Sequence, residues 1–86
     1  MLKLDAHPAA VRFLERLTPK QYRQVMRKVF ALMDEPRPQD AKALHGLPCL
    51  RADAGEYRIV YEIAGDLLRL VTVGKRNDTE VYRGLR

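Results

Sequence analysis

Two stretches near the start of the chain place hydrophobic residues at helical spacing. Between residues 5 and 17 the apolar positions recur every three or four residues, at Ala10, Phe13, Leu14 and Leu17. This spacing is typical of a helix with one buried face. Pro8 suits the first helical turn, and His7 or Asp5 before it is a candidate cap.

The next helical pattern, from Thr18 to Pro36, is the strongest in the sequence. Its apolar residues keep helical spacing throughout: Tyr22, Val25, Met26, Val29, Phe30 and Met33. Thr18 and Gln21 form a capping box, and Pro19 occupies the first helical position. Pro36 and Pro38 end the pattern. Because almost no linker separates the two helices, we expect an antiparallel helical hairpin.

After Gly46 apolar and polar residues alternate, which is typical of strands. Turn residues at 53–56 and 64–66 divide this region into two hairpins. On the middle strand one face is predicted to carry Tyr57, Ile59, Tyr61 and Ile63, and the other Arg58, Val60 and Glu62. On the last strand the same alternation separates Leu68, Leu70 and Thr72 from Arg69, Val71 and Val73. Residues 1–4 are a candidate for a short first strand.

This order of elements predicts an α+β fold. We expect the N-terminal antiparallel helical hairpin to pack on one face of a small, mainly antiparallel β-sheet. No linker, repeat or low-complexity segment interrupts the sequence, so residues 1–86 are expected to form a single domain.

Composition narrows the class of protein. Of the 86 residues, 47% are hydrophobic and 31% are charged, which is typical of a globular domain. No apolar run approaches the roughly 18–20 residues that span a bilayer, so no membrane association is expected. The single cysteine, Cys49, excludes an internal disulfide and favours a reducing, cytoplasmic compartment. A net charge of +5 favours an anionic partner, with nucleic acid the leading candidate.

Arginines lie on or just after three successive predicted strands, at Arg51, Arg58 and Arg76. Neighbouring strands could bring them together, and the planar guanidinium suits phosphate. Parity along the strands leaves open whether the three share a face, because a bulge would change it. The alternative is that all three are solvated residues at strand ends. Tyr82 is likewise either a core residue with its hydroxyl at the rim or part of a site.

Other candidate residues carry less chemistry. His7 and His45 are not spaced like metal ligands or a catalytic pair, and Cys49 is expected to fill apolar space. The glycines form no phosphate-cradling loop. The residues therefore suggest no metal and no cofactor.

Two motifs together resemble the RelE-type toxins of the RelE/ParE superfamily of bacterial toxin–antitoxin systems. They are "KALHGLPCLRADAGEYRIVYEI" and "LLRLVTVGKRNDTEVYRGL". The first is similar to the family's Leu–x–Gly, basic strand and Gly–x–Tyr–Arg–apolar–apolar–Tyr pattern. The second is similar to its strand, Gly–basic–Arg, short gap and Val–Tyr ending. The helix–helix–sheet order also agrees, so the resemblance covers nearly the whole chain.

The resemblance implies a ribosome-dependent mRNA endonuclease, which cuts mRNA in the decoding site and inhibits translation without a metal. Matched position by position, Arg51, Arg58, Arg76 and Tyr82 would be its catalytic residues. Lys42, Lys75 and Arg83 would contact the RNA. Arginine stays protonated in proteins, so Arg51 is a poor general base.

Asp53 departs from the family pattern, which commonly has a second basic residue there. A carboxylate at this position would repel RNA, or it would serve as the missing general base. Two other classes therefore stay open. One is a ParE-like inhibitor of DNA gyrase without nuclease activity, although such members generally lack the arginine–tyrosine set. The other is a catalytically silent module that binds its antitoxin.

The resemblance also implies partners. A cognate antitoxin would wrap the toxin and block its basic surface, and operator DNA would be bound only through the antitoxin. The ribosome and mRNA would be the targets. An antitoxin segment could occupy apolar grooves beside Tyr22, Val25 and Phe30, although packing in the core is the competing use of those side chains.

Overall fold

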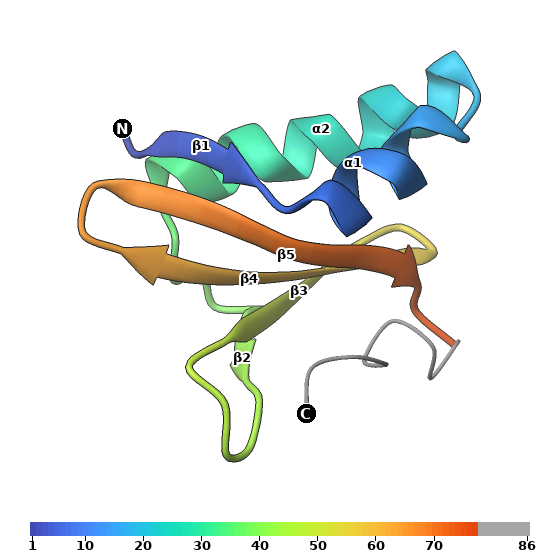
Figure 1. Cartoon of the computed structure of the whole chain (residues 1–86). Coiled ribbons are helices and arrows are strands. Elements are labelled where there is room, and N and C mark those ends of the chain that lie inside the picture. The colour runs from blue at the N-terminus through green and yellow to red at the C-terminus, as the bar shows by residue number, and fades with distance from the viewer. Residues whose placement is uncertain (78–86) are drawn as a thin grey trace.

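The structure, a computed structural model, describes residues 1–77. In chain order its elements are β1 (Lys3–Ala6), α1 (Pro8–Glu15), α2 (Pro19–Asp34), β2 (Lys42–Ala43), β3 (Leu50–Ala54), β4 (Tyr57–Ala64) and β5 (Leu67–Lys75). The strands form one sheet in the order β1-β5-β4-β3-β2, in which β1 runs parallel to β5 and the other neighbours are antiparallel. Both helices cover the same face of this sheet (Figure 1). The predicted α+β fold is confirmed.

Local capping fixes where the helices begin, as the sequence predicts. His7 caps α1, since its Nδ1 accepts a hydrogen bond from the backbone N–H of Ala9 at 3.1 Å. At α2 the capping box is complete. The Thr18 hydroxyl accepts from the N–H of Gln21 at 3.3 Å, and the Gln21 side chain accepts from the N–H of Thr18 at 3.0 Å. No helix in the described part of the chain is long and apolar enough to cross a bilayer.

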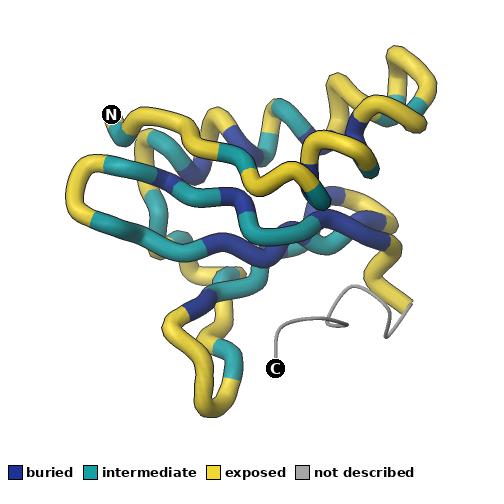
Figure 2. Tube along the Cα trace, in the orientation of Figure 1, coloured by how far each residue is buried: buried dark blue, intermediate teal, exposed yellow. Residues whose placement is uncertain are grey.

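The hydrophobic core lies between the helices and the sheet. Figure 2 shows buried positions concentrated in the central strands and on the inner side of the helices. Tyr57 from β4 contacts Phe13 of α1 edge to face, with ring centroids 6.0 Å apart. Tyr61 is completely buried, and its hydroxyl donates to the carbonyl oxygen of Pro36 at 2.7 Å. Burial raises the pKa of Tyr61 to about 12. This bond fixes the chain after α2 against the sheet.

The predicted alternation along β5 is wrong beyond Val71. The register shifts between Val60, which pairs with Thr72, and Tyr61, which pairs with Leu70, so Val71 is an extra residue in β5. Such a bulge exchanges the faces of the residues that follow it. Val73 therefore lies in the core with 3% exposure, while Thr72 shares the opposite face with Val60.

The first hairpin turn is shorter than predicted. Only Gly55 and Glu56 lie between β3 and β4, so Asp53 belongs to the strand. Gly55 has a φ of +61°, which glycine adopts without the steric cost that a side chain would add. The second hairpin is equally tight, with Gly65 and Asp66 between β4 and β5. Neither β2 nor the parallel pairing of β1 with β5 was predicted from the sequence.

Candidate functional site

The face of the sheet away from the helices carries the charged residues of β3 and β4. Arg51 pairs with Val60, and Asp53 pairs with Arg58. Directly opposite residues share a face, and so do alternate residues of one strand. Arg51, Asp53 and Arg58 therefore lie on one side, which we call the open face. On the other side of Arg58, the paired residue of β5 is Gly74, which has no side chain.

Arg58 and Asp53 form an ion pair across the β3–β4 ladder. The guanidinium Nε donates to Asp53 Oδ1 at 2.8 Å, and Nη2 donates to Oδ2 at 3.4 Å. The Arg58 side chain is 17% exposed and that of Asp53 is 34% exposed. A bidentate contact of this kind holds a long side chain in one orientation. The pair therefore fixes the position of a partly buried cation on the open face.

All three predicted arginines act on the Asp53 carboxylate. The hydrogen bond from Arg58 lowers the pKa of Asp53, and the charges of Arg58, Arg76 and Arg51 lower it further, against the opposing effect of burial. Arg58 contacts the carboxylate directly, and Arg51 and Arg76 influence it through their charges. A carboxylate whose pKa is lowered is ionised at neutral pH and is a weak proton acceptor. Asp53 is therefore poorly suited to act as a general base.

Arg76 reaches this region from the end of β5. Its backbone N–H donates to the carbonyl oxygen of Glu56 at 2.8 Å, which ties the end of β5 to the β3–β4 turn. The Arg76 side chain is exposed. Its neighbour Lys75 pairs with Tyr57, whose ring packs on α1, so by register Lys75 belongs to the helix side of the sheet. The two adjacent cations therefore do not share a face.

The remaining predicted site residues divide into two groups. Lys42, exposed on β2, pairs with Arg51 and extends the line of cations toward the edge of the sheet. Tyr82 and Arg83 lie outside the described residues.

The rest of the open face carries paired charges and an apolar cluster. At the other end Arg69 links two carboxylates, with Nε 3.1 Å from Asp5 Oδ2 and Nη1 2.7 Å from Glu62 Oε1. Between these ion pairs of Arg69 and the arginines lies an apolar cluster. It consists of Cys49 and Val60, with Leu44 and Val71 packed against them. Burial raises the pKa of the Cys49 thiol, so it stays protonated and inert. Among residues 1–77, Arg51, Arg58 and Arg76 therefore bring more positive charge to their end of this face than Asp53 balances, and we call this end the arginine site.

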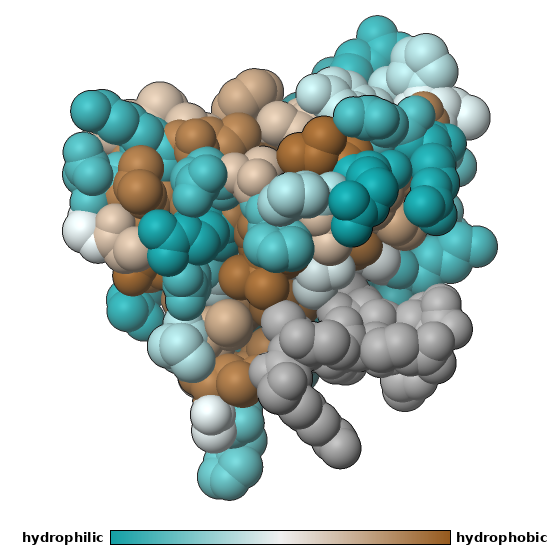
Figure 3. Space-filling view, in the orientation of Figure 1, coloured by the Kyte–Doolittle hydropathy of each residue, from teal (hydrophilic) through white to brown (hydrophobic). Residues whose placement is uncertain are grey.

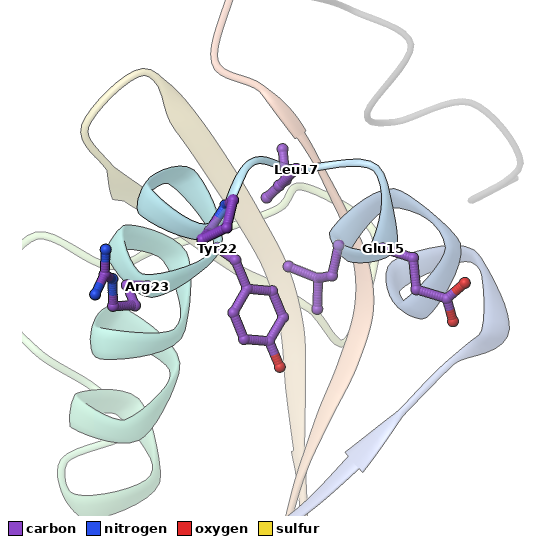
Figure 4. Close-up of a pocket in the computed structure, with 6 residues that line it drawn as sticks. Glu15, Leu17, Tyr22 and Arg23 are labelled. Carbon is purple, nitrogen blue, oxygen red and sulfur yellow. The ribbon is translucent and has the colours of Figure 1, made fainter.

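A separate groove of about 420 Å³ lies between the two helices. Figure 4 shows Tyr22 pointing from α2 toward α1, with Glu15 and Arg23 directed outward. The apolar lining residues are Leu14, Leu17, Pro19 and Tyr22. Apolar surface is also exposed beside the helices in Figure 3. Tyr22 and Phe30 are 44% and 53% exposed, whereas Val25 is completely buried. Of the three predicted groove residues, Val25 is therefore a core residue.

The pairing of Asp53 with Arg58 was not predicted from the sequence, because Asp53 was expected to lie in the turn. The sequence does contain a pattern that indicates the correct register. Gly-Glu between two alternating segments fits a two-residue hairpin loop with glycine first. That loop length alone sets Ala54 opposite Tyr57 and Asp53 opposite Arg58.

The comparisons with known proteins agree with this architecture. Residues 4–79 match the sequence profile of the ParE toxin of the type II toxin–antitoxin system parDE. The chain belongs to the ParE toxin family. A search of curated protein sequences found no significant match.

This ParE-family chain is similar in structure to solved RelE toxins, as the motif resemblance predicted. The isolated Escherichia coli RelE toxin is 26% identical, with a TM-score of 0.77 over 95% of this chain and 92% of that chain. The Mycobacterium tuberculosis RelBE2 toxin–antitoxin complex matches with 25% identity and a TM-score of 0.76, over 87% of this chain and 98% of that chain. The archaeal RelE–RelB complex from Pyrococcus horikoshii matches in fold, with 24% identity and a TM-score of 0.76, over 88% of this chain and 96% of that chain. The chain is thus a toxin of the RelE/ParE superfamily.

Proposed function

We propose that this toxin is a metal-independent endoribonuclease that cleaves mRNA in the ribosomal decoding site. The observation that carries the proposal is that Arg51 and Arg58 share the open face by strand register, while the backbone of Arg76 is tied to the β3–β4 turn next to Asp53. Likeness to isolated RelE over nearly the full length of both chains supports it. The proposed place of action is the cytoplasm, where translating ribosomes are found.

The reaction would be an in-line attack of the 2′-hydroxyl on the adjacent phosphate. The oxygen–phosphorus bond to the 5′-oxygen breaks, the hydroxyl proton is removed, and the leaving oxygen gains a proton. The products are a 2′,3′-cyclic phosphate and a 5′-hydroxyl end. Negative charge grows on the non-bridging oxygens in the transition state. Guanidiniums held in place stabilise that charge more than the ground state, which accelerates the chemical step.

The arginines would divide this work by position. Arg58, fixed by Asp53 and 17% exposed, is the oriented donor at the centre of the site. Arg76 is exposed at the end of β5 and would hold the phosphate from the side. Arg51, beside Lys42, would contact a neighbouring phosphate or the same one. Tyr82 keeps its proposed role as a proton-transfer or base-stacking residue, because Asp53 and the arginines are poor bases.

Cleavage of mRNA on purified ribosomes, mapped by primer extension, tests this proposal. We expect cuts within the decoding-site codon that disappear in Arg58→Ala/Arg76→Ala. Arg37→Ala is the matched control, because Arg37 is an exposed arginine in the loop after α2. Intact mRNA with correctly folded toxin would contradict the nuclease proposal.

Inhibition of DNA gyrase is the second candidate function. It is favoured by the match to the ParE profile, and by Asp53, which neutralises part of the arginine site. A supercoiling assay with purified gyrase separates the two candidates. Loss of supercoiling with intact mRNA would establish gyrase inhibition, whereas cleaved mRNA with unaffected supercoiling would establish the nuclease. Neither effect, with binding of the antitoxin, would identify a silent antitoxin-binding module.

We also propose a cognate antitoxin as partner, through which operator DNA would be bound. Structures of relatives as toxin–antitoxin complexes support this proposal. The groove between α1 and α2 offers an apolar surface to an antitoxin segment, and Tyr22 is its most prominent aromatic side chain.

A further inference from the structure

Asp53 occupies the place on Arg58 that an anionic ligand would take. Its two carboxylate oxygens contact Nε and Nη2, one edge of the guanidinium, at 2.8 and 3.4 Å. A phosphate presents two oxygens to a guanidinium in the same bidentate manner. The carboxylate and a phosphodiester therefore compete for this edge of Arg58.

Asp53 competes strongly with a phosphodiester because the fold preorganises the Asp53–Arg58 ion pair. The two residues are directly opposed in the β3–β4 ladder, and the two-residue Gly55–Glu56 turn fixes that register. The Arg58 side chain is only 17% exposed, so water screens the pair less than an exposed pair. A ligand that takes this edge must separate two charges that the fold has placed together.

The charge of Asp53 also reaches the other arginines. Arg51 and Arg76 both act on its carboxylate. One negative charge therefore offsets part of the field that three arginines would otherwise direct at an incoming phosphate. Lys42, paired with Arg51, adds a cation further out.

We propose that Asp53 is an internal substitute for phosphate, which weakens the binding of a phosphodiester at the arginine site and so limits the activity of this toxin. The proposal deepens the proposed function, since it rests on the arginine site being a phosphate site. It assigns Asp53 the role of an affinity-determining residue that acts through Arg58.

Binding of a short 2′-O-methyl oligoribonucleotide tests the proposal without cleavage, because this probe lacks the attacking hydroxyl. We would measure its affinity for the full chain by fluorescence anisotropy at fixed ionic strength. Asp53→Asn keeps the shape of the side chain and removes its charge. We expect roughly three- to tenfold tighter binding, the size of one partly screened charge interaction.

Asp5→Asn is the matched control. It removes the same unit charge from the same face, at an aspartate that also pairs with an arginine, Arg69, but at the far end of the sheet. We expect its affinity to change by less than about twofold, because screening weakens exposed charges beyond about 10 Å. Equal effects of Asp5→Asn and Asp53→Asn, or weaker binding by Asp53→Asn, would overturn the proposal.

A double-mutant cycle assigns the effect to Arg58. In an Arg58→Ala background, Asp53→Asn should tighten binding less than in the native chain, because only its effect on Arg51 and Arg76 remains, and a full effect there would contradict competition for Arg58. If Asp53→Asn folds poorly, Asp53→Thr provides a second uncharged variant that suits a strand. Its binding must also tighten if the proposal holds.

Cleavage on ribosomes separates this proposal from the proposed function. Faster cleavage by Asp53→Asn supports both. Tighter binding with no cleavage by any variant supports the role of Asp53 and rejects the nuclease. Cleavage by the native toxin, with binding unchanged or weakened by Asp53→Asn, supports the nuclease and rejects the role of Asp53.

Discussion

At the scale of single residues, the arginine site depends on one carboxylate. Asp53 holds Arg58 in a fixed orientation and is surrounded by the charges of Arg51 and Arg76. It orders the site when no ligand is bound, because converging guanidiniums repel one another. The same ion pair therefore stabilises the folded site and opposes its proposed ligand.

Arg76→Ala should relieve toxicity without unfolding the domain. The Arg76 side chain is exposed, and the backbone bond from its N–H to Glu56 does not depend on the side chain. Surface substitutions of this kind change the free energy of unfolding by about 0.5 kcal/mol or less. Losing one donor to a developing anion slows the chemical step by roughly 10²–10³-fold. Urea unfolding of Arg76→Ala checks that the free energy of unfolding is unchanged, and its cleavage rate on ribosomes checks the loss of activity. Loss of folding in this variant would undermine the assignment of Arg76 to the site.

Asp53 also gives the stability of the fold a dependence on pH. Its pKa is lowered in the folded state, so its contribution is fully present above the unfolded pKa of about 3.9. That contribution is lost as the pH falls through the folded pKa. Because about a third of the side chain is exposed, we expect Asp53→Asn to cost only about 1 kcal/mol at neutral pH.

Urea unfolding of the native chain and Asp53→Asn, measured from about pH 7 down to about pH 2, tests the sign of this dependence. The difference between the two proteins should shrink as Asp53 becomes protonated. A difference that stays constant across the range would show that the ionised carboxylate contributes no stability.

At the scale of elements, the two hairpin turns fix the register of the central strands. Gly55 and Gly65 both begin a two-residue turn with positive φ, at +61° and +60°. Only Gly55 lies against α2, where an added Cβ would overlap the end of the Gln24 side chain. Nothing lies within 4 Å of the corresponding position at Gly65.

Replacing each glycine with alanine separates the cost of the positive φ from the cost of the overlap with Gln24. Gly65→Ala should lower the free energy of unfolding by about 1 kcal/mol, the cost of a left-handed conformation for a residue with a side chain. Gly55→Ala should cost more, because the Gln24 side chain must also move. Adding Gln24→Ala to Gly55→Ala should bring its cost down to that of Gly65→Ala. Chemical denaturation of the native chain and these three variants provides the measurement, and equal costs for the two single glycine variants would show that the α2 contact is immaterial.

At the scale of the whole molecule, the helices and the sheet offer two different surfaces. The open face presents the arginine site, and the helix side presents the apolar groove beside Tyr22. A nucleic acid and an apolar protein segment would therefore bind on different sides of the sheet. A toxin bound through the groove alone would keep its arginine site exposed, so the proposed antitoxin must also reach the open face to block it.

Tyr22→Asp should weaken the complex with the cognate antitoxin roughly tenfold or more, because a charge would replace an aromatic contact in an apolar groove. Phe30→Asp is the control. Phe30 is also exposed on α2, but it lies about two turns further along and is not among the residues that line this groove. Co-expression of each variant with the antitoxin, followed by co-purification, gives the comparison. An equal loss in both variants would mean that the segment follows the length of α2 rather than this groove.

Much of this architecture follows from short-range patterns. The capping box at Thr18 and the alternation along β4 depend on near neighbours in the sequence, and both were predicted correctly. The cap at His7 was one of two candidates, with Asp5 the other. The RelE/ParE superfamily was also predicted from two motifs, and the profile match over residues 4–79 together with the likeness to solved RelE structures confirms it. These features are local, so one sequence is sufficient to find them.

What the sequence could not supply depends on contacts between distant segments. The parallel pairing of β1 with β5 joins residues more than sixty positions apart, and no local pattern specifies it. The bulge at Val71 moved Val73 into the core, because packing against the helices outweighs simple alternation.

The sequence alone determined that three arginines lie on or just after three successive strands and that Asp53 lies between two of them along the chain. Only the tertiary structure decided that these arginines act on one carboxylate and that Lys75 lies on the other side of the sheet. The physical reason is that electrostatic interactions depend on separation in space, and strand register sets that separation for residues far apart in the chain.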